Sequence, residues 1–174
     1  MTRSRVLYLI ACGAGPAREI HRFVELAQGA GWTVCVGATP QGRQFIESQR
    51  LEHMTGHPVR SDYDPTGSNP WPRADAVALA PATLNTVNKL SAGIADCFVM
   101  SLLCECLGLD VPIVVAPNVN PALARHPRFR SSIESLREWG VTVLFEPSAP
   151  PPIWMAPWET VLHAVDRLVP PPTG

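Results

Sequence analysis

The stretch from residue 76 to residue 96, AVALAPATLNTVNKLSAGIAD, constrains the fold more strongly than any other part of the sequence. Its apolar start, residues 76–80, is typical of a buried β-strand, and we expect Pro81 to end that strand because proline cannot donate a hydrogen bond to a neighbouring strand. Helix-capping polar residues come next. Apolar residues three and four positions apart, Ile94 among them, then predict a helix that continues to Cys106 or Leu107. A strand, a polar loop and a helix start in this order can bind a phosphate group, although an ordinary, well-capped β–α turn has the same pattern.

Strand-like and helix-like segments alternate along the rest of the chain. Further apolar runs of strand length lie at residues 6–11, 33–38, 112–116 and 141–145. Helical patterns run from Pro16 to residues 29–31, over residues 41–49, from Phe129 to Trp139 and over residues 158–169. Residues 51–73 contain four prolines and lack a regular pattern. Continuous apolar strands that alternate with helices predict an α/β fold: a three-layer, Rossmann-like (flavodoxin-like), doubly wound parallel sheet in a single domain.

Composition and charge exclude several classes of function. At 174 residues the chain can bury one substantial core, and a net charge near -1 gives no electrostatic reason to expect nucleic acid or an anionic membrane as a partner. Because no apolar run approaches the length that crosses a bilayer and the apolar residues near the start are too few for a signal peptide, we expect a cytoplasmic protein. Cys104 and Cys106 lie two apart on a predicted helix and point to different faces, so we expect no metal site.

Small and amide residues gather where the predicted strands end. They occur at residues 13–15, 83–86 and 118–120, and Thr39 ends a fourth strand. In parallel sheets of this kind, ligands bind outside the carboxyl ends of the strands. The set suits a phosphorylated ligand that meets backbone and amide groups. A dinucleotide is less well supported, because Arg18 stands where the third glycine of the G-x-G-x-x-G fingerprint belongs.

Two motifs resemble those of a known family. Residues 81–86, Pro-Ala-Thr-Leu-Asn-Thr, resemble the PASANT motif of the homo-oligomeric FMN-containing cysteine decarboxylases (HFCD flavoproteins). Residues 117–120, Pro-Asn-Val-Asn, resemble the P-x-M-N motif of the same family, and His126-Pro127 resembles the Asn-Pro that follows it. The family includes phosphopantothenoylcysteine decarboxylases and the peptidyl-cysteine decarboxylases of lantibiotic synthesis. The resemblance extends from Val6 to Phe145.

The resemblance implies a cofactor, an assembly and a set of site residues. It implies that residues 1–146 bind FMN, and we assign the proline-rich connector and closing helix, residues 147–174, to the same domain. The residues implied to hold FMN are Gly13, Ala14, Thr39, Ala82, Thr83, Asn85 and Thr86. Asn120 matches the amide that holds the substrate carboxylate, although a turn amide bonded to its own backbone explains it as well; His126 could supply a proton or lie solvated at a helix start. The family also implies a homo-oligomer, a trimer or a dodecamer, with a small-molecule or peptide substrate.

The departures from the family pattern leave the reaction open. The His that precedes the PASANT motif in the decarboxylases falls near Gly67 and Ser68 here, and neither residue is a base near neutral pH. His53 and His57 are relocated bases or solvated loop residues. The C-terminal substrate clamp is replaced by the proline-rich residues 147–157. The first reading is an FMN-dependent oxidative decarboxylase, a carboxy-lyase, that acts on a cysteine-containing peptide or small thiol with an atypical active site. The alternatives are a flavin prenyltransferase-like or other flavin enzyme, and a non-catalytic flavin-binding subunit that completes a partner's site.

Overall fold

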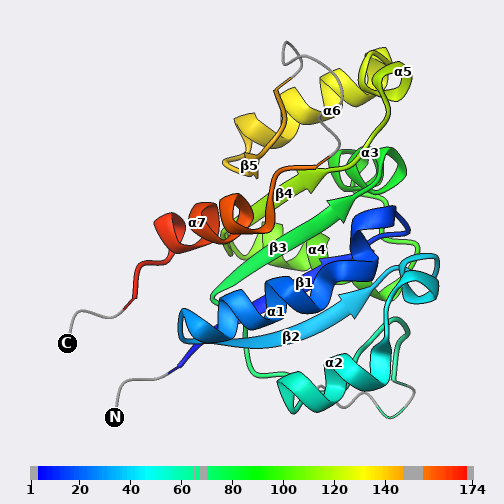
Figure 1. Cartoon of the computed structure of the whole chain (residues 1–174). Helices are drawn as coiled ribbons and strands as arrows, with labels where there is room; N and C mark the ends of the chain where they lie inside the picture. Colours follow the sequence, from blue (N-terminus) through cyan, green and yellow to red (C-terminus); the bar gives the residue numbers. More distant parts are fainter. Residues whose placement is uncertain (1–3, 65, 67–69, 147–154, 172–174) are drawn as a thin grey trace.

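A parallel sheet of five strands forms the centre of the chain (Figure 1). The computed structural model describes residues 4–64, 66, 70–146 and 155–171. The strands are β1 (Arg5–Ala11), β2 (Trp32–Ala38), β3 (Ala76–Ala82), β4 (Ile113–Pro117) and β5 (Thr142–Val143). Their order, β2-β1-β3-β4-β5, is that of a flavodoxin-like sheet and confirms the predicted doubly wound fold. The order reverses between β1 and β3, so the crevice where such sheets bind ligands lies at the carboxyl ends of these two strands.

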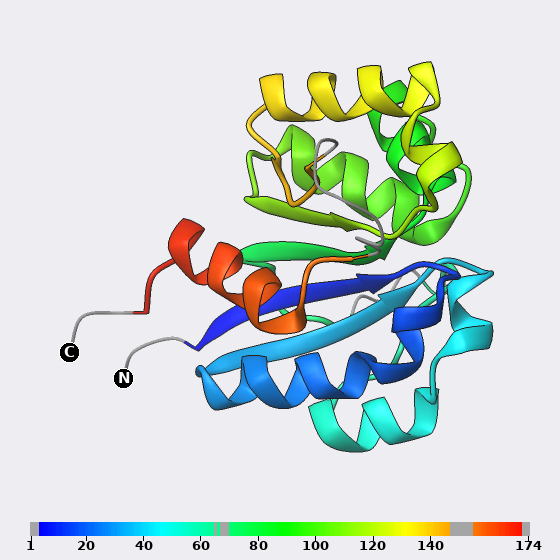
Figure 2. The same ribbon diagram turned by 45° about the horizontal axis from the view of Figure 1, so that its top comes forward.

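Helices cover both faces of the sheet, which gives the three predicted layers (Figure 2). The helices are η1 (Gly15–Glu19), α1 (Ile20–Gly29), η2 (Gly42–Phe45), α2 (Ser48–Thr55), α3 (Leu84–Ala92), α4 (Phe98–Gly108), α5 (Pro121–Ala124), α6 (Pro127–Glu138) and α7 (Trp158–Leu168). Successive strand residues point to opposite faces: Leu79 packs with α3, α4 and α6, whereas Ala78 packs with α1 and α7. No helix in the described ranges is long and apolar enough to cross a membrane.

Arg5 ties the start of the sheet to the C-terminal helix. Its side chain is 8% exposed, and its guanidinium carbon lies 4.2 Å from the ring centroid of Trp32. It donates to Oδ1 of Asp166 in α7 (3.0 Å) and to the carbonyl oxygens of Val169 (2.6 Å) and Ala30 (2.7 Å). Nε1 of Trp32 donates to the same Asp166 oxygen (2.9 Å). One carboxylate therefore holds both a nearly buried cation and an indole N–H, and these bonds fix α7 against the sheet.

β3 continues through Pro81, so the prediction that this residue ends the strand is wrong. β3 pairs regularly with β4 as far as Leu79 opposite Val115, and after a register shift Ala82 lies opposite Pro117. Pro81, which follows a cis peptide bond, falls within that shift, so its missing N–H interrupts no regular ladder bond. Its carbonyl oxygen accepts from the N–H of Cys12 (3.1 Å). The end of β3 thereby stays fixed to the end of β1.

The single long helix predicted after β3 is in fact two helices. Gly93 adopts a left-handed conformation (φ 67°) and ends α3, and α4 begins at Phe98. A left-handed residue cannot continue a helix, which explains the break. Ile94, expected on the buried stripe, is 46% exposed. α4 buries apolar residues of its own, and these continue the three- and four-residue spacing of α3. The sequence pattern therefore looked like that of one long helix.

The region between β2 and β3 also contains more structure than its sequence suggested. The short helix expected over residues 41–49 is replaced by η2 and by α2, which extends into the segment predicted to be irregular. α2 buries Leu51 as its sole buried residue, so it carries little periodic signal. Trp71, later in the same segment, is 5% exposed and packs on Tyr8, with 5.0 Å between ring centroids. Gly67, Ser68 and residues 147–154 of the connector lie outside the described residues.

Candidate functional site

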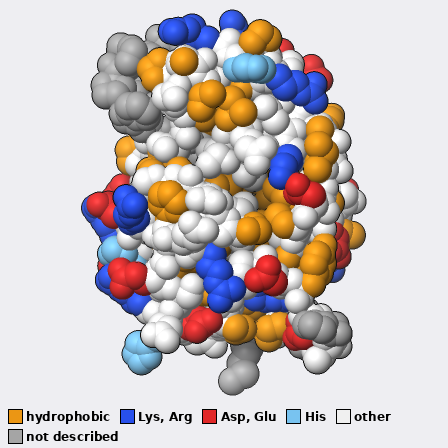
Figure 3. All heavy atoms as spheres, turned by 90° about the vertical axis from the view of Figure 1, so that its right-hand side faces the viewer, with side chains coloured by type: hydrophobic (Ala, Val, Ile, Leu, Met, Phe, Trp, Pro, Cys, Tyr) orange, Lys and Arg blue, Asp and Glu red, His pale blue; other side chains and the backbone are white. Residues whose placement is uncertain are grey.

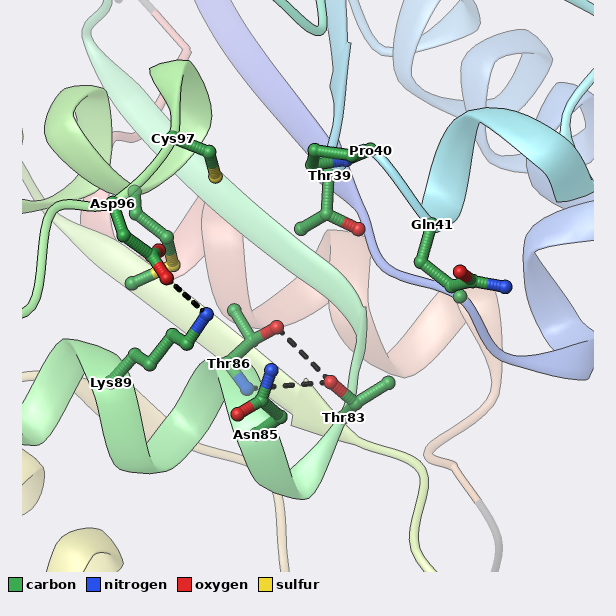
Figure 4. A pocket seen from close by; sticks show the side chains of 11 residues that line it. Thr39, Pro40, Gln41, Thr83, Asn85, Thr86, Lys89, Asp96 and Cys97 are labelled. Atoms are coloured by element: carbon green, nitrogen blue, oxygen red, sulfur yellow. Dashed lines mark hydrogen bonds and ion pairs between the residues drawn. The ribbon is translucent and has the colours of Figure 1, made fainter.

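An open cavity of about 500 Å³ lies at the carboxyl ends of β1, β2 and β3, where the strand order reverses (Figure 4). It is lined by Gly13, Thr39, Pro40, Gln41, Thr83, Asn85, Thr86, Lys89, Asp96, Cys97 and Met100. Figure 3 looks onto this end of the sheet, where the centre carries few charged side chains and most of the charges lie toward the margins. The position is the one expected for the ligand site of a doubly wound sheet.

The start of α3 supplies polar groups to one wall of this cavity. Thr83 caps the helix: its Oγ1 accepts from the backbone N–H of Thr86 (3.3 Å) and lies 3.0 Å from Oγ1 of Thr86. The N–H groups of Leu84 and Asn85, in the same first turn, have no carbonyl partner within the helix. Hydroxyl groups, an amide and unpaired N–H groups at a helix N-terminus suit a phosphate or another anion.

The opposite wall is a turn that lies directly on the end of β1. The N–H of Thr39 donates to the carbonyl oxygen of Ala11 (2.9 Å), and Oγ1 of Thr39 accepts from the N–H of Gly42 (2.9 Å). A Cβ atom on Gly42 would lie 2.3 Å from the Ala11 oxygen, and one on Gly13 would lie 2.5 Å from Cγ of Gln41. The absence of side chains at both glycines therefore allows the turn to approach the strand so closely.

An ion pair closes the far end of the cavity. Nζ of Lys89 in α3 lies 2.5 Å from Oδ2 of Asp96, and the two side chains are 27% and 49% exposed. Asp96 can reach Lys89 because the chain turns at Gly93 before α4 begins. The pair leaves this lining with one positive and one negative side chain, so the cavity carries little net charge.

Five of the seven residues predicted to hold a cofactor line the cavity: Gly13, Thr39, Thr83, Asn85 and Thr86. The other two, Ala14 and Ala82, are buried beside them at 7% and 0% exposure.

Six lining residues were not predicted: Pro40, Gln41, Lys89, Asp96, Cys97 and Met100. Lys89 could have been found, because it lies three and four positions after Thr86 and Asn85 on one helix face. The position of Asp96 depends on the helix break, which the sequence pattern did not reveal.

The two residues predicted to be catalytic do not line the cavity of their own chain. Oδ1 of Asn120 accepts from the N–H of Leu123 (2.9 Å) and caps α5, which is the backbone-bonded arrangement that the sequence left open. Nδ1 of His126 accepts from the N–H of Arg128 (3.1 Å) and caps α6. Both side chains are exposed, and their catalytic roles remain predictions. His53 and His57 are also absent from the cavity lining, and the described ranges hold no group of three or more His, Cys, Asp or Glu side chains that could bind a metal.

Relatives with a known assignment resemble this chain over most of its length. "Probable phosphopantothenoylcysteine decarboxylase" of Streptococcus mutans is 34% identical over 117 residues, which is 63% of this chain and 65% of the relative. "Coenzyme A biosynthesis bifunctional protein CoaBC" of Bacillus subtilis is 30% identical over 157 residues, which is 85% of this chain and 37% of the relative. The chain spans between about a quarter and two thirds of the length of the curated relatives that it matches first.

Solved structures of similar fold include several flavoproteins. The FMN-dependent cysteine decarboxylase SpaF superposes with a TM-score of 0.74 at 24% identity, covering 94% of this chain and 98% of that one. The peptidyl-cysteine decarboxylase EpiD gives a TM-score of 0.76 at 20% identity, covering 94% and 99%. The FMN-binding protein AtHal3 gives 0.77 at 19% identity, covering 99% and 100%. At these identities the likeness establishes the fold.

A family assignment follows from the sequence match, the fold and the cavity together. The hydroxyl, amide and N–H donors of the cavity fit the phosphate and polar chain of a flavin nucleotide, and two glycines keep its opposite wall close to β1. The sequence model of the Flavoprotein family matches residues 1–170, which confirms the resemblance inferred from the two motifs. The chain is a member of the Flavoprotein family.

Proposed function

We propose that this protein binds FMN and catalyses the oxidative decarboxylation of a cysteine-containing peptide or small thiol. The observation that carries the proposal is the position of Thr83, Asn85 and Thr86, three residues of the PASANT-like motif, on one wall of the cavity at the switch point of the sheet. The relative from Streptococcus mutans, a probable phosphopantothenoylcysteine decarboxylase by name, supports the same reaction class.

We infer that the flavin bound in this cavity is FMN. The first turn of α3, with Thr83, Asn85 and Thr86, would bind the phosphate or the polar chain, and Thr39 and Gly13 would face them from the opposite wall. When bound, FMN would supply the oxidising chemistry: two electrons and two hydrogens would leave the thiol and β-carbon of the cysteine, and the carboxylate would then be lost as CO₂ to give an enethiol. The protein contributes binding, orientation and proton handling.

Asn120 is proposed to hold the carboxylate that leaves. Its Oδ1 is occupied by the cap of α5, which leaves the two N–H bonds of the same amide to donate to an anion. His126 accepts at Nδ1, so the neutral ring carries its proton at Nε2, where it can donate. Because both residues are exposed and lie away from the cavity of their own chain, we propose that they serve the cavity of a neighbouring copy in a homo-oligomer, a trimer or a dodecamer.

Two measurements test the cofactor and the assembly. We expect the purified protein to be yellow and to release FMN on denaturation, with mass spectrometry of the released ligand as the assay. Release of FAD, or no flavin after soaking with FMN, would contradict the cofactor. Light scattering of the flavin-bound protein at micromolar concentration should return an oligomer, and a monomer would contradict the shared site.

The proposed role of Asn120 is tested by variants that keep or remove its helix-capping oxygen independently of its N–H donors. Asn120→Asp keeps an oxygen that caps α5 but removes the N–H donors and adds a negative charge, so CO₂ release should be lost while the flavin spectrum is retained. Asn120→Ala should lose both the cap and the activity. Full activity of Asn120→Asp on an identified substrate would show that the assignment is wrong.

We expect little turnover of phosphopantothenoylcysteine itself. The position of the family's His falls at Gly67 and Ser68, and the loss of a positioned acid–base group slows a reaction by roughly a hundred- to ten-thousand-fold. The same departure favours one second candidate, a flavin-binding subunit that completes a partner's site. FMN binding without release of CO₂ from any cysteine-terminated peptide of a library would favour that candidate.

A further inference from the structure

Cys12 lies beneath the cavity and takes no part in the proposed chemistry. Its side chain is 1% exposed, and its backbone N–H donates to the carbonyl oxygen of Pro81 (3.1 Å). Its Sγ lies 3.2 Å from Oγ1 of Thr86, which lies 3.0 Å from Oγ1 of Thr83. The three side chains form a hydrogen-bonded chain that begins in the core and ends at the half-buried Thr83 on the cavity wall. Figure 4 shows its outer part, from Thr86 to Thr83.

The donor and acceptor capacities of the three groups give this chain a direction. Burial raises the pKa of the Cys12 thiol above its ordinary value, so the group is protonated at neutral pH and donates to Thr86. Thr86 can then donate its own hydrogen to Oγ1 of Thr83. That oxygen already accepts from the backbone N–H of Thr86, so both of its lone pairs are filled. The Thr83 side chain also interacts directly with the Cys12 thiol, but sulfur is a weak acceptor, so the hydroxyl hydrogen of Thr83 remains available to a stronger acceptor in the cavity.

The opposite direction is less favourable. If Thr83 donated to Thr86, the Thr86 oxygen would accept from both Thr83 and Cys12, and its own hydrogen would need another acceptor. Thr86 is 4% exposed, and among the described residues its hydroxyl oxygen has hydrogen-bonding contacts with Cys12 and with Thr83 alone. A buried hydroxyl hydrogen without an acceptor is destabilising, so the direction from Cys12 to Thr83 is preferred.

We propose that Cys12 is a positioning residue for the flavin: through Thr86 it orients the hydroxyl group of Thr83 as a hydrogen-bond donor to an acceptor atom of bound FMN. This inference rests on the proposed function, because it takes FMN as the ligand. Cys12 would then be a residue that affects flavin binding although it lies outside both family-like motifs and outside the cavity lining.

The test measures FMN affinity by fluorescence titration of the flavin-free protein, which requires no turnover. Cys12→Ala removes the first donor and should weaken FMN binding about two- to tenfold, the range expected for one hydrogen bond. Cys12→Ser keeps a donor and should bind within about twofold of the wild type. Cys35→Ala, which removes another buried thiol of the same core, is the matched control and should leave the affinity unchanged.

A double-mutant cycle separates this arrangement from simple packing. Thr86→Val breaks the chain at its centre, so adding Cys12→Ala to it should weaken FMN binding no further. Additive effects, or a Cys12→Ser variant as weak as Cys12→Ala, would overturn the inference even if each variant unfolds like the wild type. If the wild-type protein binds FMN and Cys12→Ala binds it equally well, this inference fails while the proposed function stands. A wild type that does not bind FMN refutes both.

Discussion

Replacing Gly42 by alanine should disturb the flavin site without replacing any side chain proposed to bind the flavin. Gly42 closes the turn that carries Thr39, Pro40 and Gln41, three residues of the cavity wall. An added Cβ would lie 2.3 Å from the carbonyl oxygen of Ala11 and 3.0 Å from Oγ1 of Thr39. The nearest obstacle is the backbone of β1, an interior strand of the sheet, which cannot rotate away, so the turn itself has to move.

The size of the effect follows from the bonds that hold the turn. The N–H of Thr39 donates to the carbonyl oxygen of Ala11 (2.9 Å), and the N–H of Gly42 donates to the side-chain Oγ1 of Thr39 (2.9 Å). Overpacking typically costs about 1–3 kcal/mol, and each distorted hydrogen bond about 0.5–1.5 kcal/mol. We expect a loss of about 2–3 kcal/mol in the free energy of unfolding, and FMN binding at least about tenfold weaker because Thr39 and Gln41 move away from α3.

The assay compares two glycine variants by urea unfolding and by FMN titration. Gly29→Ala is the control, because nothing lies within 4 Å of the Cβ position and Gly29 is the last residue of α1. It should leave FMN affinity unchanged and stability equal or slightly higher, since alanine favours a helix over glycine. If Gly42→Ala unfolds and binds FMN like Gly29→Ala, the close approach of the turn to β1 does not shape the site.

Two further predictions concern stability. Asp166→Leu removes the shared partner of Arg5 and Trp32, and we expect it to lower the free energy of unfolding by about 3 kcal/mol. This is the low end of the range for a broken buried pair, because the Asp166 side chain is 30% exposed. Asp62→Ala breaks an exposed pair with Arg43 and should cost less than about 1 kcal/mol, so equal losses of the two variants in urea unfolding would refute the contrast. Burial raises the pKa of Cys35 to about 12, so the folded state retains a proton that the unfolded chain loses near pH 8.5, and its stabilising effect, complete below about pH 8.5, is lost as the pH rises toward 12. Between pH 8 and 10.5 the wild type should therefore lose about 2–3 kcal/mol more than Cys35→Ala, and parallel pH curves would contradict this account.

The parts of the fold that the sequence predicted well are those whose signal is local. Each predicted strand appears in the sheet. The strands of a parallel sheet are covered by helices on both faces, so they appear in the sequence as continuous apolar runs. The cavity wall formed by the start of α3 could also be predicted, because Thr83 is a helix cap that its residue type and its position in the sequence identify.

The parts that were missed depend on contacts distant in sequence or on a single backbone conformation. Pro81 stays in β3 because a register shift with β4 accommodates it, and no local pattern encodes that shift. One left-handed glycine, Gly93, separates α3 from α4 and brings Asp96 back to Lys89. Glycine occurs inside helical patterns often enough that Gly93 alone could not reveal the break.

The site therefore divides into two halves with different structural support. The half that faces the flavin is built from the ends of β1, β2 and β3 and from the first turn of α3, all fixed by the sheet. The residues proposed to handle the substrate, Asn120 and His126, lie on α5 and at the start of α6, beyond the cavity of their own chain. Flavin binding should consequently survive changes at Asn120. Changes at Thr86 should weaken flavin binding, and they should slow the reaction only because less flavin is bound. Because the family-like residues are retained mainly in the first half, we expect a flavoprotein whose substrate differs from phosphopantothenoylcysteine.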